Sequence, residues 1–201
     1  IPQQKYNYDE NGYTLTNIRY YSDGTKKSEY RYEYYANKKQ KSEVYYSYNS
    51  DGSVYSNTVT LYNESGKTLS YTSYNGDGTK ISENLYEYYA NGYKKSYKSY
   101  KYDEEGNAIP QRITTYNENE NTLSDIRYYS DGTKSSETLY GYYASGNMKS
   151  YIYYSYYSDG SVNYHNEYTY NENGDKIAYI TYRANGLKFT EDLYEYYEDG
   201  K

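Results

Sequence analysis

Between regularly spaced turns, the chain carries runs of about ten residues in which aromatic and polar side chains alternate. The segments 30–34 (YRYEY) and 194–196 (YEY) show the pattern in its simplest form. A period of two places every second side chain on the same face of a β-strand. No helical period competes with it, so the pattern predicts an all-β chain.

The turns between these runs have the form x-(Asp/Asn/Ser/Glu)-Gly, as in Ser22-Asp23-Gly24. Asp and Asn suit the last position of a type I turn, and Gly accepts the left-handed conformation that follows. We therefore expect β-hairpins with three-residue loops. The turn positions are Gly12, Gly24, Lys38, Gly52, Gly66, Gly78, Gly92, Gly106, Glu120, Gly132, Gly146, Gly160, Gly174, Gly186 and Gly200, with Lys38 and Glu120 standing in for Gly.

The spacing of the turns reveals a tandem repeat. The intervals between successive turn positions are 12, 14, 14 and 14, and the series then starts again, so the repeat has a period of 54 and contains four strands. We expect one continuous array over 1–201, with units at approximately 8–61, 62–115, 116–169 and 170–201. The residue four before each turn position is always Tyr, and we call this set the Tyr ladder: Tyr8, Tyr20, Tyr34, Tyr48, Tyr62, Tyr74, Tyr88, Tyr102, Tyr116, Tyr128, Tyr142, Tyr156, Tyr170, Tyr182 and Tyr196.

A parity argument predicts which face the Tyr ladder occupies. Across a three-residue loop, paired residues have numbers that add to an even number, so even-numbered residues would stay on one face throughout. Each ladder Tyr would then oppose the residue two after the turn position, often Lys or Thr, and the next pair would set Tyr, Ile or Thr against Ser. The other face would carry mixed charges such as Lys27, Glu29 and Arg31. With loops of even length, the ladder would instead alternate between faces.

These features predict an antiparallel β-meander of about 15 strands, coiled or in a single layer. An open sheet with so many strands must twist, coil or close. A four-bladed β-propeller is the alternative, because four strands per unit match the strands of a blade. Propeller blades usually pack on one another through apolar side chains, which are scarce in this chain.

Composition supports a folded chain with an unusual interior. Leu, Ile, Val and Phe make up only about a ninth of the residues, whereas 42 of the 201 are Tyr. Tyr supplies large rigid surface that favours strands and keeps its hydroxyl hydrated. The net charge of −6 comes without a basic cluster, which argues against nucleic-acid binding, and Cys is absent. No apolar run approaches the roughly 20 residues of a membrane helix, so we expect no membrane insertion.

Two families of repeats share the turn motifs. The segments 8–12 (YDENG) and 102–106 (YDEEG) resemble the YD repeats of the Rhs family, and 88–92 (YYANG) and 170–174 (YNENG) resemble MORN-like bacterial hairpin repeats. The Gly-Arg-Leu that often follows a YD turn is absent from this chain. The resemblance implies a secreted β-sheet ribbon or shell and no catalytic activity.

The residues that could carry chemistry favour ordinary structural roles. The one histidine, His165, lies within a strand pattern, where a catalytic triad or metal site would depend on it alone. The turn at 75–78 (NGDG) lacks the spacing of calcium-binding loops. Acidic pairs recur in every unit, whereas a catalytic pair needs one singular environment. We expect no enzyme, no metal and no cofactor.

The Tyr ladder is the one functional candidate, because contiguous exposed aromatic surface usually marks an interaction site. The first hypothesis is an extracellular structural protein, such as a self-assembling fibre, a surface layer or an adhesin stalk, whose partner is another copy of itself. The second is a module that binds a polysaccharide or cell wall through the Tyr ladder. Both place the chain outside the cell or at its surface.

Overall fold

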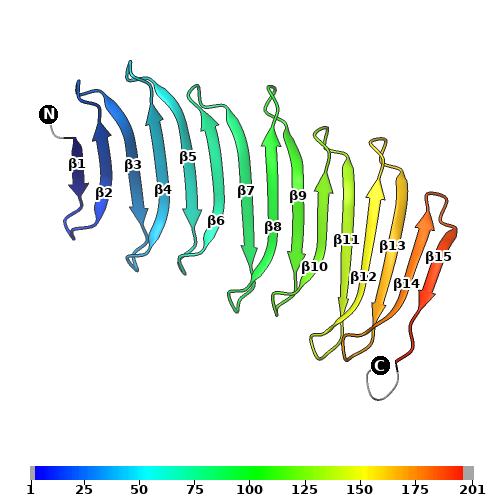
Figure 1. Cartoon of the computed structure of the whole chain (residues 1–201). Coiled ribbons are helices and arrows are strands. Elements are labelled where there is room, and N and C mark those ends of the chain that lie inside the picture. The colour runs from blue at the N-terminus through cyan, green and yellow to red at the C-terminus, as the bar shows by residue number, and fades with distance from the viewer. Residues whose placement is uncertain (1–2, 197–201) are drawn as a thin grey trace. The chain divides into compact units, whose positions relative to one another are not determined.

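The computed structural model describes residues 3–196, and every regular element in this range is a β-strand. Fifteen antiparallel strands form one open sheet in which strand order equals chain order (Figure 1). The predicted single-layer β-meander is therefore confirmed. The alternative of a four-bladed propeller is wrong, because the strands share one sheet and are not divided among blades.

Most strands end at the ladder Tyr that precedes the next turn, as the alternating pattern predicts. The strands are β1 (Gln4–Tyr8), β2 (Thr14–Tyr20), β3 (Lys26–Tyr34), β4 (Gln40–Tyr48), β5 (Val54–Tyr62), β6 (Thr68–Asn75), β7 (Lys80–Tyr88), β8 (Lys94–Tyr102), β9 (Ala108–Tyr116), β10 (Thr122–Tyr128), β11 (Lys134–Tyr142), β12 (Met148–Tyr156), β13 (Val162–Tyr170), β14 (Lys176–Arg183) and β15 (Lys188–Leu193).

The chain divides into two compact units, and the boundary between them falls within β7, β8 and β9. Among the described residues, the first compact unit comprises 3–86 and 99–108, and the second comprises 87–98 and 109–196. Each compact unit contains consecutive hairpins with the same local geometry, so the hairpin can be described once for both compact units.

The loops have the predicted three-residue form. Between β2 and β3, the Tyr21 amide donates to the Thr25 carbonyl at 2.8 Å, and the Gly24 amide donates to the Tyr21 carbonyl at 3.1 Å. Gly24 has a φ of 92°, in the left-handed region that Gly tolerates best. Lys38 and Glu120, the two stand-ins for Gly, adopt φ of 70° and 63°. The predicted turn at Gly200 lies outside the described residues.

The register corrects the parity argument. Tyr20 pairs with Lys26 as predicted, but Arg19 then pairs with Ser28, so Lys27 opposes no residue and forms a β-bulge. The same shift occurs in each of the twelve hairpins whose register is described. The bulge residues, three after each turn position, are Leu15, Lys27, Lys41, Tyr55, Leu69, Ile81, Leu123, Ser135, Lys149, Asn163, Ile177 and Phe189.

The bulge changes which side chains share a face. Ile18 pairs with Glu29, so the even-numbered residues of β2 lie on the same face as the odd-numbered residues of β3. Tyr20 and Tyr34 consequently lie on opposite faces. The prediction of one Tyr face and one charged face is wrong, because the extra residue in each hairpin reverses the parity that the loop alone preserves.

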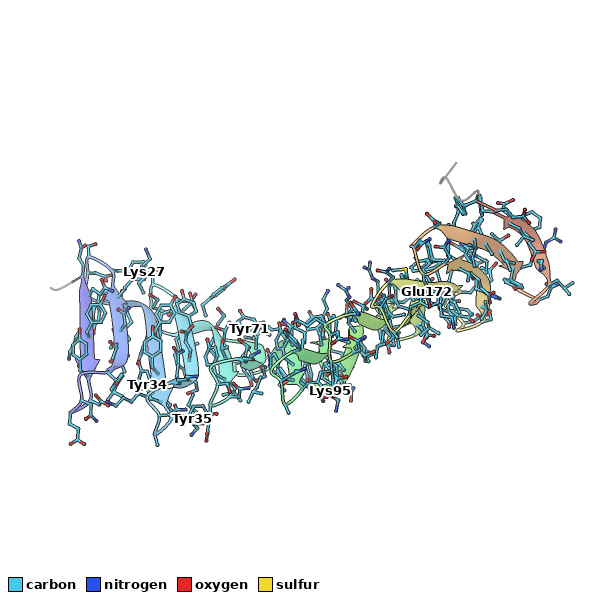
Figure 2. All side chains as sticks on the ribbon, turned by 90° about the horizontal axis from the view of Figure 1, so that it is seen from below. Lys27, Tyr34, Tyr35, Tyr71, Lys95 and Glu172 are labelled. Carbon is cyan, nitrogen blue, oxygen red and sulfur yellow. The ribbon has the colours of Figure 1, made fainter. Side chains whose placement is uncertain are left out.

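Small and polar side chains, not apolar ones, are buried. Within the described range, Ile18 is the only buried large apolar residue. Side chains project from both faces of the sheet (Figure 2). The predicted pairing of Tyr, Ile or Thr with Ser is wrong, because the bulges shift the partners: Ser28 pairs with Arg19 and Ser42 with Glu33. The buried polar residues are Ser28, Glu29, Ser42, Ser70, Thr72, Ser96, Thr114 and Thr138.

Candidate functional site

Within each compact unit, the Tyr ladder is divided between the two faces of the sheet. Successive ladder residues alternate where the register is described, because each of those twelve hairpins contains one bulge. In the first unit, one face carries Tyr20, Tyr48, Tyr74 and Tyr102, and the other carries Tyr8, Tyr34 and Tyr62. In the second unit, one face carries Tyr128, Tyr156 and Tyr182, and the other carries Tyr116, Tyr142 and Tyr170.

Most rings of the Tyr ladder are half-buried. Tyr8 and Tyr196, with exposed fractions of 57% and 44%, are the exposed members. The remaining thirteen, Tyr88 among them, have intermediate exposure. Because these thirteen rings are half-buried, only part of each ring is available to a ligand.

Several ladder hydroxyls are bound within the sheet. The hydroxyls of Tyr34, Tyr142 and Tyr196 each donate to the carbonyl oxygen of the residue twenty positions earlier, at 2.9, 2.8 and 2.8 Å. Burial raises the pKa of Tyr34 and Tyr142, since the neutral phenol tolerates desolvation better than its anion. Each hydrogen bond connects the chain at the end of one strand with the start of the preceding strand.

A Lys–Glu–Tyr cluster on one face contains further ladder hydroxyls. Tyr48 donates to Glu29 Oε2 at 2.8 Å, and Lys26 donates to the same oxygen at 2.7 Å. Arg31 donates to the other carboxylate oxygen, also at 2.7 Å. The bulge at Lys41 makes this geometry possible, because it shifts the β3–β4 register so that Glu29 pairs with Tyr46 and lies on the face of Tyr48.

The cluster recurs once in each of the next two units of the repeat. Its second copy is Lys80, Glu83 and Tyr102, with contacts of 3.1 and 2.8 Å to the carboxylate. Its third copy is Lys134, Glu137 and Tyr156, with contacts of 2.8 and 2.9 Å. In the three copies the Lys ammonium also lies 5.5, 4.8 and 5.2 Å from the centroid of the Tyr ring, where a cation–π attraction operates.

The cluster holds its groups in fixed protonation states. Glu29 is 3% exposed, and burial alone would raise its pKa. Hydrogen bonds from Arg31, Lys26 and Tyr48 outweigh burial and lower the pKa of Glu29 to about 2. Burial and the bond to Glu29 raise the pKa of Tyr48 to about 12. Proton transfer at neutral pH needs a pKa near 7, so this geometry suits a structural contact.

A second recurring contact connects loops at the same end of the sheet. The hydroxyl of Tyr35 donates to the Tyr62 carbonyl at 2.6 Å, and Tyr89 and Tyr143 make the same bond to Tyr116 and Tyr170 at 2.7 Å. Figure 2 labels Tyr35 beside the ladder residue Tyr34. These loop Tyr residues lie outside the predicted ladder. Their signal in the sequence was a Tyr directly after a ladder Tyr at the same place in successive units.

His165 lies between two Tyr rings on one face of the second compact unit. Its ring centroid lies 4.9 Å from that of Tyr154 and 4.1 Å from that of Tyr182, and its Nε2 lies 3.7 Å from Glu167 Oε1. Among residues 3–196, no group of three or more His, Cys, Asp or Glu side chains could hold a metal ion. The same range contains no helix that is long and apolar enough to cross a membrane.

The last strands of the second compact unit carry an open hollow of about 500 Å³. It lies over β13, β14 and β15, and its aromatic lining includes Tyr157, Tyr164 and Phe189. None of these three residues belongs to the Tyr ladder, although the ladder residue Tyr182 also lines the hollow. Sequence reasoning missed them because it followed the residues that precede the turns, whereas Phe189 is a bulge residue.

The comparisons with known proteins show only distant likeness. No family model matches the chain, and no curated protein matches it. The Tc holotoxin pore of Photorhabdus luminescens is 14% identical with a TM-score of 0.35, and the match covers 98% of this chain and 13% of that one. A pneumococcal O-GlcNAc transferase is 13% identical with a TM-score of 0.26, over 53% of this chain and 19% of that one.

A Bacteroides fragilis protein of unknown function is 13% identical with a TM-score of 0.23, over 77% of this chain and 92% of that one. This chain therefore spans only a small part of the first two proteins. At this level of similarity we derive no function from any of the three, and the likeness to YD and MORN-like repeats stays a resemblance of motifs.

Proposed function

We propose that the chain is an extracellular structural repeat protein, a β-sheet scaffold that associates with further copies of itself. The observation that carries the proposal is the Lys–Glu–Tyr cluster, which recurs at 26/29/48, 80/83/102 and 134/137/156. A binding site usually has one distinct environment, whereas a contact repeated from unit to unit serves the architecture that the units share.

The side chains with the greatest capacity for interaction bond mainly to the sheet itself. Ladder hydroxyls reach Glu side chains and backbone carbonyls, and loop Tyr hydroxyls reach the ends of strands further along the chain. Each hydrogen bond contributes about 0.5–1.5 kcal/mol, and more when one partner is charged. Distributed over the repeats, these contacts stabilise a sheet that has little apolar core.

Strand pairing offers a route to self-association. Within the described sheet, β1 and β15 each have one neighbouring strand, β2 and β14 respectively. Every residue of both outer strands is exposed. Unpaired backbone amides and carbonyls at a sheet edge are a template for pairing with another chain. A strand of a second copy would continue the same hydrogen-bonded ladder.

Electron microscopy and sedimentation of the whole 201-residue chain test this proposal. The expected result is a concentration-dependent series of oligomers that grows into ordered assemblies. The double variant Tyr6→Lys, Tyr8→Lys puts two charges on β1 and should reduce assembly, because charged edge strands resist pairing. Tyr55→Lys, on the interior strand β5, is the matched control and should assemble normally. Dispersed monomers at high concentration would contradict the proposal.

A further inference from the structure

The hollow over β13–β15 combines aromatic rings with polar side chains and one cation. Phe189 is 60% exposed, and Tyr157 and Tyr164 are also exposed. Asn163 and Asn166 line the same hollow, and so does Arg183. The volume of about 500 Å³ lies within the roughly 300–1,000 Å³ of small-molecule sites. A sugar ring has apolar faces and hydroxyls at its edge. A site for it therefore needs aromatic surface beside a few polar groups, and the hollow has both.

The polar groups of the hollow are available to a ligand. The side-chain amides of Asn163 and Asn166 have no hydrogen-bond partner among the described residues. Each amide offers two donors and an acceptor. The hydroxyls of Thr181 and Thr190, by contrast, bond to each other at 2.6 Å. The two amides therefore supply the directional contacts, with the Thr pair beside them.

Arg183 gives the hollow its charge. Its guanidinium lies over the Phe189 ring at 4.6 Å, a cation–π contact that positions the group. Within residues 3–196 the guanidinium forms no ion pair, and no carboxylate lines the hollow. An exposed guanidinium without an acidic partner can donate two parallel hydrogen bonds to the carboxylate of a ligand. This is a local exception in a chain whose net charge is −6.

We propose that this hollow binds an acidic sugar, a uronate residue of a polysaccharide, which stacks on Phe189 and Tyr164 and places its carboxylate at Arg183. One cation matches the single charge of a uronate, whereas a nucleotide phosphate carries more charge than one guanidinium neutralises. One ladder residue, Tyr182, is part of the lining, and its hydroxyl donates to Glu167 at 3.3 Å. The site does not depend on self-association.

Calorimetric titration of the whole chain with tetragalacturonate tests the site, with a neutral cello-oligosaccharide and adenosine monophosphate as comparison ligands. The expected result is saturable binding of tetragalacturonate with a dissociation constant of about 1 mM or below. The neutral sugar and the nucleotide should bind more weakly. Equal or tighter binding of either comparison ligand would overturn the proposal, as would the absence of tetragalacturonate binding.

Variants assign the binding to the hollow. Phe189→Ala should weaken tetragalacturonate binding by about tenfold or more. Arg183→Gln should abolish the preference for the acidic sugar, and Arg183→Lys should retain part of it. Tyr55→Ala is the matched control, because Tyr55 occupies the same bulge position in β5 and is 66% exposed, with Asn49 in the position of Arg183. Circular dichroism verifies folding, and a Tyr55→Ala loss equal to that of Phe189→Ala would refute the site.

Discussion

Removing the Tyr48 hydroxyl tests whether the Lys–Glu–Tyr clusters stabilise the sheet. In Tyr48→Phe, Glu29 loses a 2.8 Å donor but keeps its contacts with Lys26 and Arg31. Hydrogen bonds to charged groups contribute about 1.5–3 kcal/mol. Because Tyr48 is half-buried and two other donors remain, we expect a loss of about 1.5 kcal/mol, at the lower end of that range.

A double-mutant cycle with Glu29→Gln separates this contact from other effects of the substitutions. The single and double variants are unfolded in urea at neutral pH, and the coupling energy is obtained from their unfolding free energies. We expect a coupling of about 1 kcal/mol. Tyr74→Phe is the control, because Tyr74 lies on the same face and its hydroxyl has no hydrogen-bond partner among the described residues. Equal losses for Tyr48→Phe and Tyr74→Phe, with no coupling to Glu29, would refute a stabilising role.

Three further predictions follow from the cluster and the turns. The pKa of Glu29 falls from its ordinary 4.5 to about 2, so its stabilising contribution, up to about 3 kcal/mol, is complete above pH 4.5 and is lost as the pH falls toward 2. Melting temperatures measured across this range should show a smaller acid loss in Glu29→Gln than in Glu33→Gln, and equal profiles would contradict the assignment. The pKa of Tyr48 rises from 10.0 to about 12, so its contribution is present below pH 10 and lost as the pH rises through 12. Ultraviolet titration of tyrosinate should show a late-ionising component that shrinks in Tyr48→Phe, and an unchanged curve would count against this value. Lys38→Gly should raise the unfolding free energy by about 0.5–1 kcal/mol, because a left-handed conformation costs a non-Gly residue about 1–2 kcal/mol. Gly52→Ala should lower it in the same denaturation assay, and opposite signs would disprove the turn geometry.

The strand order and loops could be predicted from the sequence because both depend on local signals. Alternating side chains define each strand, and the Asp-Gly and Asn-Gly turns define each hairpin. Even Lys38 and Glu120, which lack the Gly signal, follow from the spacing and adopt the predicted positive φ. Because each hairpin leads directly into the next, chain order then gives strand order.

The arrangement of faces could not be predicted because the bulge has only a weak local signal. Leu15, Leu69, Ile81 and Phe189 stand out as apolar residues near strand starts, yet Lys27 and Ser135 occupy the same bulge position. Whether such a residue pairs or bulges depends on packing against the neighbouring strand, which a count of loop residues does not include. The contact between Tyr48 and Glu29 was missed for the same reason.

Cysteine crosslinking tests the register shift, on which the arrangement of both faces depends, most directly. The chain contains no cysteine. Ser73 pairs with Ser82, and their hydroxyl oxygens lie 2.6 Å apart, whereas a hairpin without the bulge at Ile81 would pair Thr72 with Ser82. Disulfides need Cβ atoms roughly 3.5–4.5 Å apart. We predict that Ser73→Cys, Ser82→Cys oxidises readily to an intramolecular disulfide and that Thr72→Cys, Ser82→Cys does not. The reverse outcome would contradict the bulged register and the face assignments derived from it.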